Sequence, residues 1–216
     1  MTASDLWADL SNNDPAFDPR EYRRAGHLLI GWKATQGSWF VDTTHADAVK
    51  GAHAEGLVVA HYHFAEPQRS GPRTEARTFW QQVRPTYRDG DYLVLDLERG
   101  KDARIRGDVR TLLGWCVAFA RELRKLSGHW PILYVNLDYL LTLGRMTALV
   151  FPRRVWLAQY AEHATPPRWA RPLWAWQRTD GDVGRPPFTL PGCPRRCDVN
   201  VLNARTFRRL RSRAGA

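Results

Sequence analysis

Four carboxylates stand where apolar segments of the chain give way to polar ones. Asp96 and Glu98 end the apolar run 92–98, Asp9 ends the first apolar segment, and Asp198 lies in the last one. Residues i and i+2 of a strand point to the same side, so Asp96 and Glu98 share one face. Crowded carboxylates push their pKa values apart, so that one can stay protonated near neutral pH. Glycoside hydrolysis needs such a pair, one group to protonate the leaving oxygen and one to stabilise the charge on the sugar.

The positions of the two acids in the run predict different roles. Glu98 lies at the very end of the run among other acids, which favours the protonated form that a general acid needs. Asp96 lies one layer deeper, and we expect it to stay ionised beside the developing positive charge. The alternative is a pair of ordinary strand-end acids neutralised by Arg99 and Lys101. The apolar strand and the two further acids favour the catalytic interpretation.

Two histidines offer a second interpretation. His61 and His63 are spaced i, i+2 and could form a metal pair that the carboxylates complete, as in a metal-dependent hydrolase. No further histidine lies at another strand end, so hydrogen bonding in the mouth of the barrel is the favoured role. We therefore expect neither a metal nor another cofactor.

Aromatic residues are the other chemical signal, because the chain has ten Trp and seven Tyr. Flat rings stack on the apolar faces of sugars, as on any flat apolar surface. The candidates on predicted strands are Tyr62, Tyr134, Trp156, Tyr160, Trp174 and Trp176. Trp115, on the apolar face of a predicted helix, is expected in the core. Rings interleaved with Arg would also suit nucleic-acid bases, but no binding motif is present and the acids would repel phosphate, so we expect no nucleic acid.

Alternating segments predict the elements that must position these residues. Strands are predicted over 6–10, 28–33, 57–64, 92–98, 131–136, 155–160, 173–177 and 197–202, and helices over 46–55, 74–83, 108–126 and 205–213. Strands that alternate with helices indicate parallel βαβ units, although the late strands lack helices between them. A closed α/β barrel, incomplete in its last third, fits this pattern best. Closure would make the first and last strands neighbours and bring Asp9 beside Asp198.

Length and composition bound the alternatives. The chain has 216 residues, which favours a single domain over 1–216, and a net charge of +10, which favours an anionic polymer as partner. No apolar run is long enough to span a membrane. The start carries acids where a secretory signal needs basic residues, so no signal peptide is expected. Three cysteines make no disulfide framework, although Cys193 and Cys197 could form a local disulfide.

With these residues in place, the sequence resembles glycoside hydrolase family 25, the N-acetylmuramidases of bacteria and phage endolysins. The resemblance runs over about residues 6–203 in the family's order. Its segments are Asp-Leu-Ser at 9–11, Lys-Ala-Thr-Gln-Gly at 33–37, Phe-Val-Asp at 40–42, Tyr-His-Phe at 62–64, Asp-Leu-Glu at 96–98, Tyr-Val-Asn at 134–136, Trp-Leu-Ala-Gln-Tyr at 156–160, Trp-Gln at 176–177 and Asp-Val-Asn at 198–200.

The resemblance implies an irregular, flattened TIM-like β/α barrel with incomplete helices in its last third. It implies cleavage of the β-1,4 bond between N-acetylmuramic acid and N-acetylglucosamine in peptidoglycan. Glu98 would be the proton donor, and Asp96 would stabilise charge or orient the substrate's N-acetyl oxygen. Asp9 and Asp198 would hold the substrate and tune these two acids. The matched substrate-binding residues are Lys33, Tyr62, Tyr134, Trp156 and Gln177.

The chain departs from the family pattern at a few places. Gln36 stands where the family often has Glu, and Ala60 where it often has Gly. The proline-rich segment 181–196 could reshape the groove and alter substrate preference. A non-catalytic glycan-binding module on the same barrel remains an alternative. We expect a monomer that acts on bacterial walls, attracted by their anionic polymers, after release from the cytoplasm as phage endolysins are, with secretion as an alternative context.

Overall fold

The computed structural model describes residues 4–14, 16–98 and 109–214. The strands are β1 (Leu6–Leu10), β2 (Leu29–Gln36), β3 (Phe40–Val41), β4 (Val58–Phe64), β5 (Tyr92–Asp96), β6 (Ile132–Asn136), β7 (Val155–Ala158), β8 (Ala175–Thr179) and β9 (Asp198–Leu202). The helices are α1 (Pro19–Arg24), α2 (His45–Ala54), α3 (Pro72–Val83), α4 (Val109–Ser127), α5 (Leu137–Leu143), α6 (Thr147–Val150), the 3₁₀ helix η1 (Arg168–Ala170) and α7 (Ala204–Ala214).

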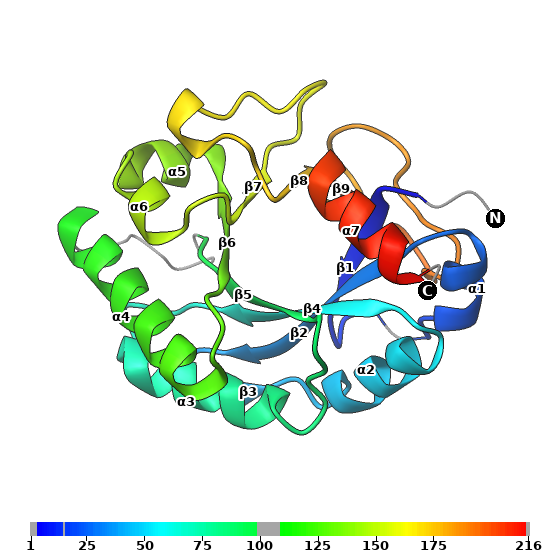
Figure 1. Cartoon of the computed structure of the whole chain (residues 1–216), viewed down its shortest axis with the longest axis horizontal. Helices are drawn as coiled ribbons and strands as arrows, with labels where there is room; N and C mark the ends of the chain where they lie inside the picture. Colours follow the sequence, from blue (N-terminus) through cyan, green and yellow to red (C-terminus); the bar gives the residue numbers. More distant parts are fainter. Residues whose placement is uncertain (1–3, 15, 99–108, 215–216) are drawn as a thin grey trace.

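Eight strands close into a mixed barrel, which confirms the predicted fold class. Around the barrel the strands follow the order β1, β9, β8, β7, β6, β5, β4, β2, and pairing of β1 with β2 completes the ring. The pairs from β1–β2 through β7–β8 are parallel, whereas β9 is antiparallel to both β8 and β1. Helices α2 to α6 line the outside of the earlier strands (Figure 1), and no helix separates β8 from β9. The barrel is therefore complete in its strands and incomplete in its helices.

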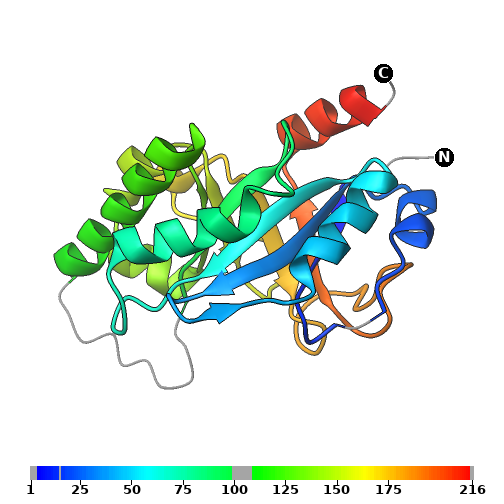
Figure 2. The ribbon, with the colours of Figure 1, turned by 90° about the horizontal axis from the view of Figure 1, so that it is seen from below.

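The antiparallel direction of β9 matters for the position of Asp198. In a parallel barrel, functional groups gather at the C-terminal ends of the strands. Because β9 runs the other way, its first residue lies at that end, and Asp198 pairs directly with Asp9 of β1. The last residues of β9 lead to α7 at the other end, from which β2 and β4 start (Figure 2). The sequence correctly predicts the contact of the first and last strands.

Strand alternation divides the apolar side chains between the inside and the outside of the barrel. The interior is filled by large rings and small aliphatic groups, including Trp7, Val94, Trp156 and Trp174. Outside, the other face of β5 packs its leucines against α3 and α4, as its alternating pattern predicts. Trp115 of α4 lies in this outer layer, so its predicted core position is confirmed. A second outer layer covers β1, β2 and β4 beneath α1 and α2.

The element bounds differ from the predicted ones by a few residues, and some short elements were not expected. β2 continues to Gln36 and forms a hairpin with β3. Helix α1 begins at Pro19 after Asp18, whose side chain accepts hydrogen bonds from two backbone N–H groups, a signal present in the sequence. Asn136 likewise caps α5 through the Tyr139 N–H. Position 108, the predicted start of the long helix, lies outside the described residues.

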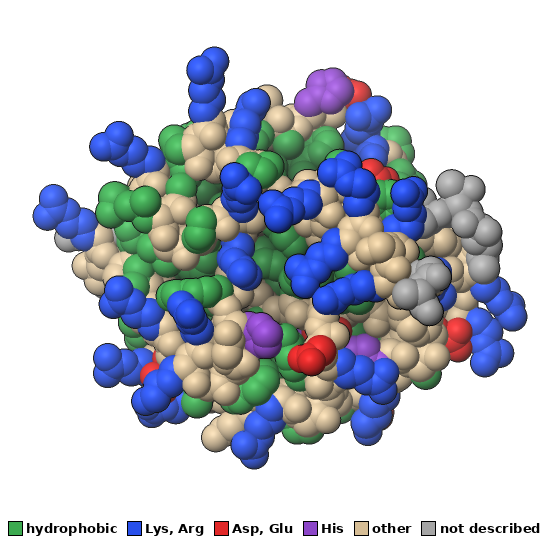
Figure 3. Space-filling view, viewed as in Figure 1, with side chains coloured by type: hydrophobic (Ala, Val, Ile, Leu, Met, Phe, Trp, Pro, Cys, Tyr) green, Lys and Arg blue, Asp and Glu red, His purple; other side chains and the backbone are tan. Residues whose placement is uncertain are grey.

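The molecular surface is strongly basic. Figure 3 shows Lys and Arg side chains spread over the whole of one face, with few acidic ones between them. Helix α7 contributes five exposed arginines, and only Thr206 and Leu210 of this helix are buried. None of these arginines forms an ion pair with another described residue. Among the described helices, none is long and apolar enough to cross a membrane.

Closure of the barrel depends on a close approach at Gly31, the partner of Asp9 in the β1–β2 pair. A Cβ at Gly31 would lie 2.5 Å from the Asp9 Cβ and 3.1 Å from the Trp7 ring. We expect Gly31→Ala to lower the free energy of unfolding by about 1–3 kcal/mol, because overpacking forces backbone shifts. Chemical denaturation measures this change.

The exposed Gly114 in α4 provides the matched control, because a Cβ there meets nothing within 4 Å. Gly114→Ala should raise the free energy of unfolding by about 0.5–1 kcal/mol through helix propensity. A Gly31→Ala protein as stable as the wild type would show that the β1–β2 closure is looser than the structure indicates.

Candidate active site

A pocket opens at the end of the barrel where the parallel strands terminate. Residues of seven barrel strands and of the segments that follow some of them line it: Asp9, Ser11, Asn13, Lys33, Tyr62, Phe64, Asp96, Glu98, Tyr134, Trp156 and Asp198. Eight of the nine residues that the sequence singles out are in this lining, and the ninth, Gln177, donates a hydrogen bond to Asp198 at 2.8 Å. The structure therefore brings the complete predicted set together, although no ligand marks their roles.

The carboxylates differ in their hydrogen bonds. Asp9 accepts from Asn200 Nδ2 at 2.7 Å, and Asp198 accepts from Gln177 Nε2. Asp96 is buried, with 5% of its surface exposed, and its Oδ1 atom has no hydrogen-bond partner among the described residues. An unpartnered carboxylate oxygen is costly to bury unless a ligand meets it or the group holds a proton. Asp96 is thus the least satisfied acid of the pocket.

Burial and mutual repulsion keep protons on these acids. Desolvation raises the pKa of Asp9 to about 7 and, together with the charge of Asp9, that of Asp198 to about 9. Desolvation and the charge of Glu98 raise the pKa of Asp96 well above its usual range. Desolvation also raises the pKa of Glu98, and the nearby Lys33 opposes that rise. The pocket as a whole therefore carries less negative charge at neutral pH than its four acids suggest.

This result differs from the prediction that Asp96 stays ionised. Asp96 lies one layer deeper than Glu98, and this position was expected to give the two acids different roles. The same depth removes Asp96 further from water, and this desolvation raises its pKa. In the unliganded pocket Asp96 therefore favours the neutral form as well. A positive charge placed beside it would reverse this preference, because an opposite charge stabilises the carboxylate.

The aromatic side chains have two different environments. Trp156 is 2% exposed, lies 4.6 Å from Trp7 and 4.7 Å from Tyr134 between ring centroids, and donates to Asn200 Oδ1 at 2.7 Å. It therefore presents only an edge to the pocket. Tyr134 donates its hydroxyl proton to Gln177 Oε1 at 2.6 Å. Tyr62 is partly exposed in the pocket wall.

Asn200 joins these groups and, like the lining residues Ser11, Asn13 and Phe64, was not singled out as a site residue by the sequence analysis. Its amide nitrogen donates to Asp9, and its amide oxygen accepts from Trp156. The signal was present, since Asn200 follows Asp198 at i+2 on one strand and must share its face. Asn200 fixes both an acid and a ring of the pocket.

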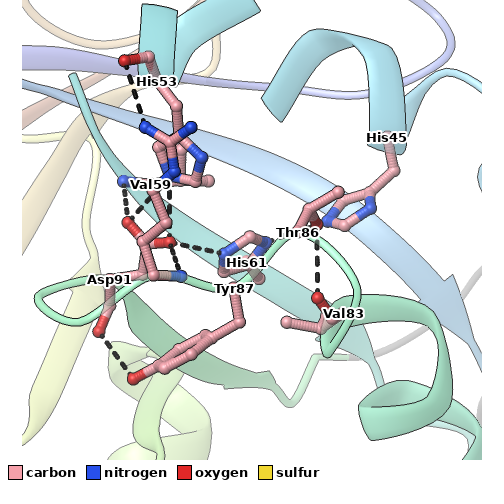
Figure 4. Close-up of polar contacts among 9 residues, drawn as sticks. His45, His53, Val59, His61, Val83, Thr86, Tyr87 and Asp91 are labelled. Carbon is pink, nitrogen blue, oxygen red and sulfur yellow. Dashed lines mark hydrogen bonds and ion pairs between the residues drawn. The ribbon is translucent and has the colours of Figure 1, made fainter. Parts of the chain in front are cut away.

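The metal-site alternative is not supported by the geometry. His61 and His63 alternate with Tyr62 and therefore point outward from β4, so the prediction that they lie in the barrel mouth is wrong. Figure 4 shows His61 between His45 and Asp91; its ring nitrogens lie 2.9 Å from His45 Nε2 and 3.3 Å from Asp91 Oδ2, and the pocket lining does not include it. Within the described ranges, no group of three or more potential ligands is arranged to hold a metal ion.

His63 is bound in the same outer layer. Its ring nitrogens contact Thr35 Oγ1 at 2.7 Å and Glu75 Oε2 at 2.8 Å, and all three residues are buried. The two histidines therefore attach helices to the outside of the barrel. Arg99 and Lys101, the partners in the simpler interpretation of the acid pair, lie outside the described residues.

The segment 181–196 reaches the rim of the pocket. Arg195 contacts Asp14 and the backbone oxygen of Asn13, and Asn13 is part of the pocket lining. Leu190 and Cys193 pack on the outer layer beneath α1. Cys193 and Cys197 are free thiols in this structure. The segment therefore shapes one edge of the pocket without entering it.

The raised pKa of Asp198 makes the free energy of unfolding depend on pH. The group is neutral when folded up to about pH 9 but ionises near pH 4 when unfolded, so the stability that it contributes is lost as pH rises between these values. Asp198→Asn removes this loss. We expect its melting temperature to exceed that of the wild type by an amount that grows from pH 5 to pH 9.

Thermal denaturation across this pH range tests the point. Asp138→Asn on α5, where the carboxylate is exposed, is the matched control, because it removes an acid without touching the pocket. A curve for Asp198→Asn parallel to that of the wild type would show that its carboxyl group ionises freely in the folded protein.

Comparisons with known proteins agree with this geometry. Residues 8–183 match glycosyl hydrolases family 25. An N,O-diacetylmuramidase of Arthroderma benhamiae is 27% identical over 135 residues, which are 61% of this chain and 57% of that relative. The match thus spans little more than half of the relative's length.

Two solved structures share the fold. A muramidase from Acremonium alcalophilum has a TM-score of 0.78 at 23% identity, over 98% of this chain and 99% of that one. A bacterial lysozyme from Streptomyces coelicolor has a TM-score of 0.79 at 20% identity, over 96% and 97% of the two chains. The family match covers most of the sequence, and the chain therefore belongs to glycosyl hydrolases family 25.

Proposed function

We propose that the chain, as one catalytic domain, is a muramidase that cleaves the β-1,4 bond between N-acetylmuramic acid and N-acetylglucosamine in peptidoglycan. The observation that carries this proposal is the convergence of four desolvated carboxyl groups with Tyr and Trp side chains in one pocket at the barrel mouth. Family membership and the muramidase names of similar proteins support the choice of substrate.

Glu98 is the proton donor in this proposal. Desolvation raises its pKa, which favours the protonated form that a general acid needs, and it is less buried than Asp96, so it lies nearer to an entering substrate. It gives its proton to the glycosidic oxygen as the bond from that oxygen to the anomeric carbon breaks. Water then adds to the anomeric carbon, and the proton that it loses returns to Glu98.

Asp96 meets the positive charge that develops at the sugar ring. Its Oδ1 has no hydrogen-bond partner among the residues that the structure describes, so it is available to the ring or to the substrate's N-acetyl group. The reactive form is the one in which Asp96 is already ionised before the bond breaks. Because the group is buried, little water screens the attraction of its carboxylate for the developing charge. The interaction is therefore stronger in the transition state than in the ground state.

Asp9 and Asp198 hold the substrate and tune these acids. Both are fixed by side-chain amides, Asp9 by Asn200 and Asp198 by Gln177. Gln177 also accepts from Tyr134, and Asn200 accepts from Trp156, so each of the two amides orients one acid and one ring. Lys33, which lies in the pocket wall near Asp96 and Glu98, limits the rise of both pKa values.

The substrate class implies a place of action at the bacterial wall. We propose that the protein reaches the wall after release from the cytoplasm, as an endolysin does, and that its positive charge draws it to anionic wall polymers. Lysis of intact bacteria by added protein would support action from outside, whereas lysis only of permeabilised cells would restrict it to action from within.

A non-catalytic binding module would share the barrel and the aromatic residues but not the need for Glu98. We expect Glu98→Gln, which keeps the shape but cannot donate a proton, to lose at least about 100-fold in turnover, the usual scale of general acid catalysis. The variant should still fold and bind glycan. Release of reducing ends from purified walls measures the loss, and wild-type activity in this variant would contradict the catalytic assignment.

The two acids should respond differently to the leaving group. A substrate whose leaving group needs little protonation should restore much of the activity lost in Glu98→Gln. Asp96→Asn should also be severely impaired, but such a substrate should restore it less, because the missing charge is needed at the ring and not at the departing oxygen. Equal rescue of both variants would show that the roles are assigned wrongly.

The basic surface should matter for finding the wall and not for cleaving the bond. Surface attraction is screened beyond about 8–10 Å at 0.1–0.15 M salt, whereas contacts inside the pocket are screened less. We expect wall binding and lysis to fall from low to high salt while turnover of a short soluble glycan changes little. The same salt dependence for both substrates would remove this role of the charge.

A further inference from the structure

Two aromatic side chains are exposed beside the pocket. Among the large apolar residues that are exposed in the described part of the chain, only Trp39, at 59%, and Tyr160, at 39%, are aromatic. Trp39 lies in the turn between β2 and β3, and Tyr160 follows β7 by two residues. Both strands end at the barrel mouth, so both rings lie at the end of the barrel that holds the pocket.

The two rings stand on opposite sides of this mouth. Around the barrel, β4, β5 and β6 separate β2 from β7 in one direction, and β1, β9 and β8 separate them in the other. The acids of the pocket come from the strands between, with Asp96 on β5 on one side and Asp9 and Asp198 on β1 and β9 on the other. Around the ring of strands, the acids therefore lie between Trp39 and Tyr160 in both directions.

Hydrogen bonds hold Trp39 in place and connect it to the pocket. Its Nε1 donates to Glu66 Oε2 at 2.6 Å, although the ring itself is exposed. Glu66 Oε1 accepts from Gln36 Nε2 at 2.9 Å, and Gln36 Oε1 accepts from Lys33 Nζ at 2.8 Å. Lys33 lines the pocket. A chain of three hydrogen bonds thus leads from the pocket wall to the exposed ring.

Gln36 is the residue that connects Lys33 to Glu66 in this series of hydrogen bonds. An amide can accept from Lys33 and donate to Glu66 at the same time. A glutamate at this position, which the family often has, would place a second carboxylate against Glu66. Gln36 thus occupies one oxygen of Glu66, and the other oxygen accepts from Trp39.

Tyr160 is connected to the pocket in a similar way. Its hydroxyl donates to Gln177 Oε1 at 3.3 Å, and Gln177 in turn donates to Asp198 at 2.8 Å. Its ring, like that of Trp39, is left open on the outer side. A rigid aromatic ring that is already positioned loses little conformational freedom when a flat ligand stacks on it.

We propose that Trp39 and Tyr160 are stacking platforms for the outer sugars of a long glycan strand, one on each side of the cleaved bond. The ligand is the apolar face of a pyranose ring, and the strand crosses the mouth from one platform to the other over Asp96 and Glu98. This inference rests on the proposed function, because it assumes a polymeric glycan as substrate. It gives the enzyme a preference for long strands over short oligosaccharides.

The test compares two soluble fragments of peptidoglycan glycan, one long enough to reach both platforms and one confined to the central pocket. A stacked ring contributes about 0.5–1.5 kcal/mol, so Trp39→Ala and Tyr160→Ala should each raise KM for the long fragment about two- to tenfold with kcat retained. The KM for the short fragment should change much less. Trp39→Phe and Tyr160→Phe should keep most of the affinity for the long fragment.

Two further variants separate stacking from structure. Leu149→Ala on α6 removes another exposed apolar side chain, 73% exposed and outside the pocket lining, and should leave both KM values unchanged. Glu66→Ala keeps the Trp39 side chain but removes the hydrogen bond that fixes its orientation. It should raise KM for the long fragment by less than Trp39→Ala does. The proposal would be overturned if Trp39→Ala and Tyr160→Ala each changed KM for the short fragment as much as for the long one. It would also be overturned if neither variant changed either KM.

Binding by the Glu98→Gln protein distinguishes this proposal from the proposed function. Titration with the long fragment should show weaker binding after Trp39→Ala in that background, with no hydrolysis needed. If the wild type binds the long fragment through both rings but cleaves neither fragment, the muramidase proposal fails and the platforms stand. If the wild type cleaves both fragments with the same KM, the platforms fail and the muramidase proposal stands.

Discussion

The desolvation of four carboxyl groups in one barrel mouth is the constraint on which the rest of the structure depends. Parallel strands deliver Asp96 and Glu98 to this end, and only the reversed direction of β9 brings Asp198 to the same end, beside Asp9. The interior below must then exclude water, which the packed rings around Trp7 and Trp156 do. The raised pKa values of Asp9, Asp96 and Asp198 follow from this burial. The barrel thus disfavours ionisation of these acids at the place where the proposed reaction develops positive charge.

Buried acids elsewhere in the molecule show the opposite arrangement. On the outer face of β4, Asp91 is hydrogen-bonded to the rings of His53 and His61 and to the backbone N–H groups of Val59 and Arg88. These bonds overcome its desolvation and hold its pKa below the usual range. Asp96 is comparably buried, but its Oδ1 has no hydrogen-bond partner within the described ranges. Asp91 therefore fastens helix α2 and the start of β5 to the barrel. Asp96, in contrast, has an oxygen that a ligand could meet in the proposed reaction.

The period of two along a strand explains most of what the sequence predicts and where the prediction fails. It correctly places Asp96 and Glu98 on one face and the leucines of β5 on the other. The same rule, applied to β4, shows that Tyr62 and the adjacent histidines cannot share the mouth, and Tyr62 is the residue that lines the pocket. Asn200 was open to the same argument. The sequence could not predict the ionisation of Asp96 in this way. The depth of a residue along a strand does not show whether a hydrogen-bond donor meets its buried oxygen.

The charge distribution follows from the separation of these environments. A net charge of +10 is carried on the outside, where water and salt reduce its effect at the pocket, as the unpaired arginines of α7 illustrate at the far end of the barrel. Inside the mouth, Lys33 is the only basic side chain of the described lining, and it acts on Asp96, Glu98 and Glu66 together. Burial lowers the pKa of Lys33, and these carboxylates oppose that change. One lysine therefore couples the acids of the proposed reaction to the hydrogen-bonded chain that ends at Trp39, so that long-strand binding and catalysis share a wall of the same pocket.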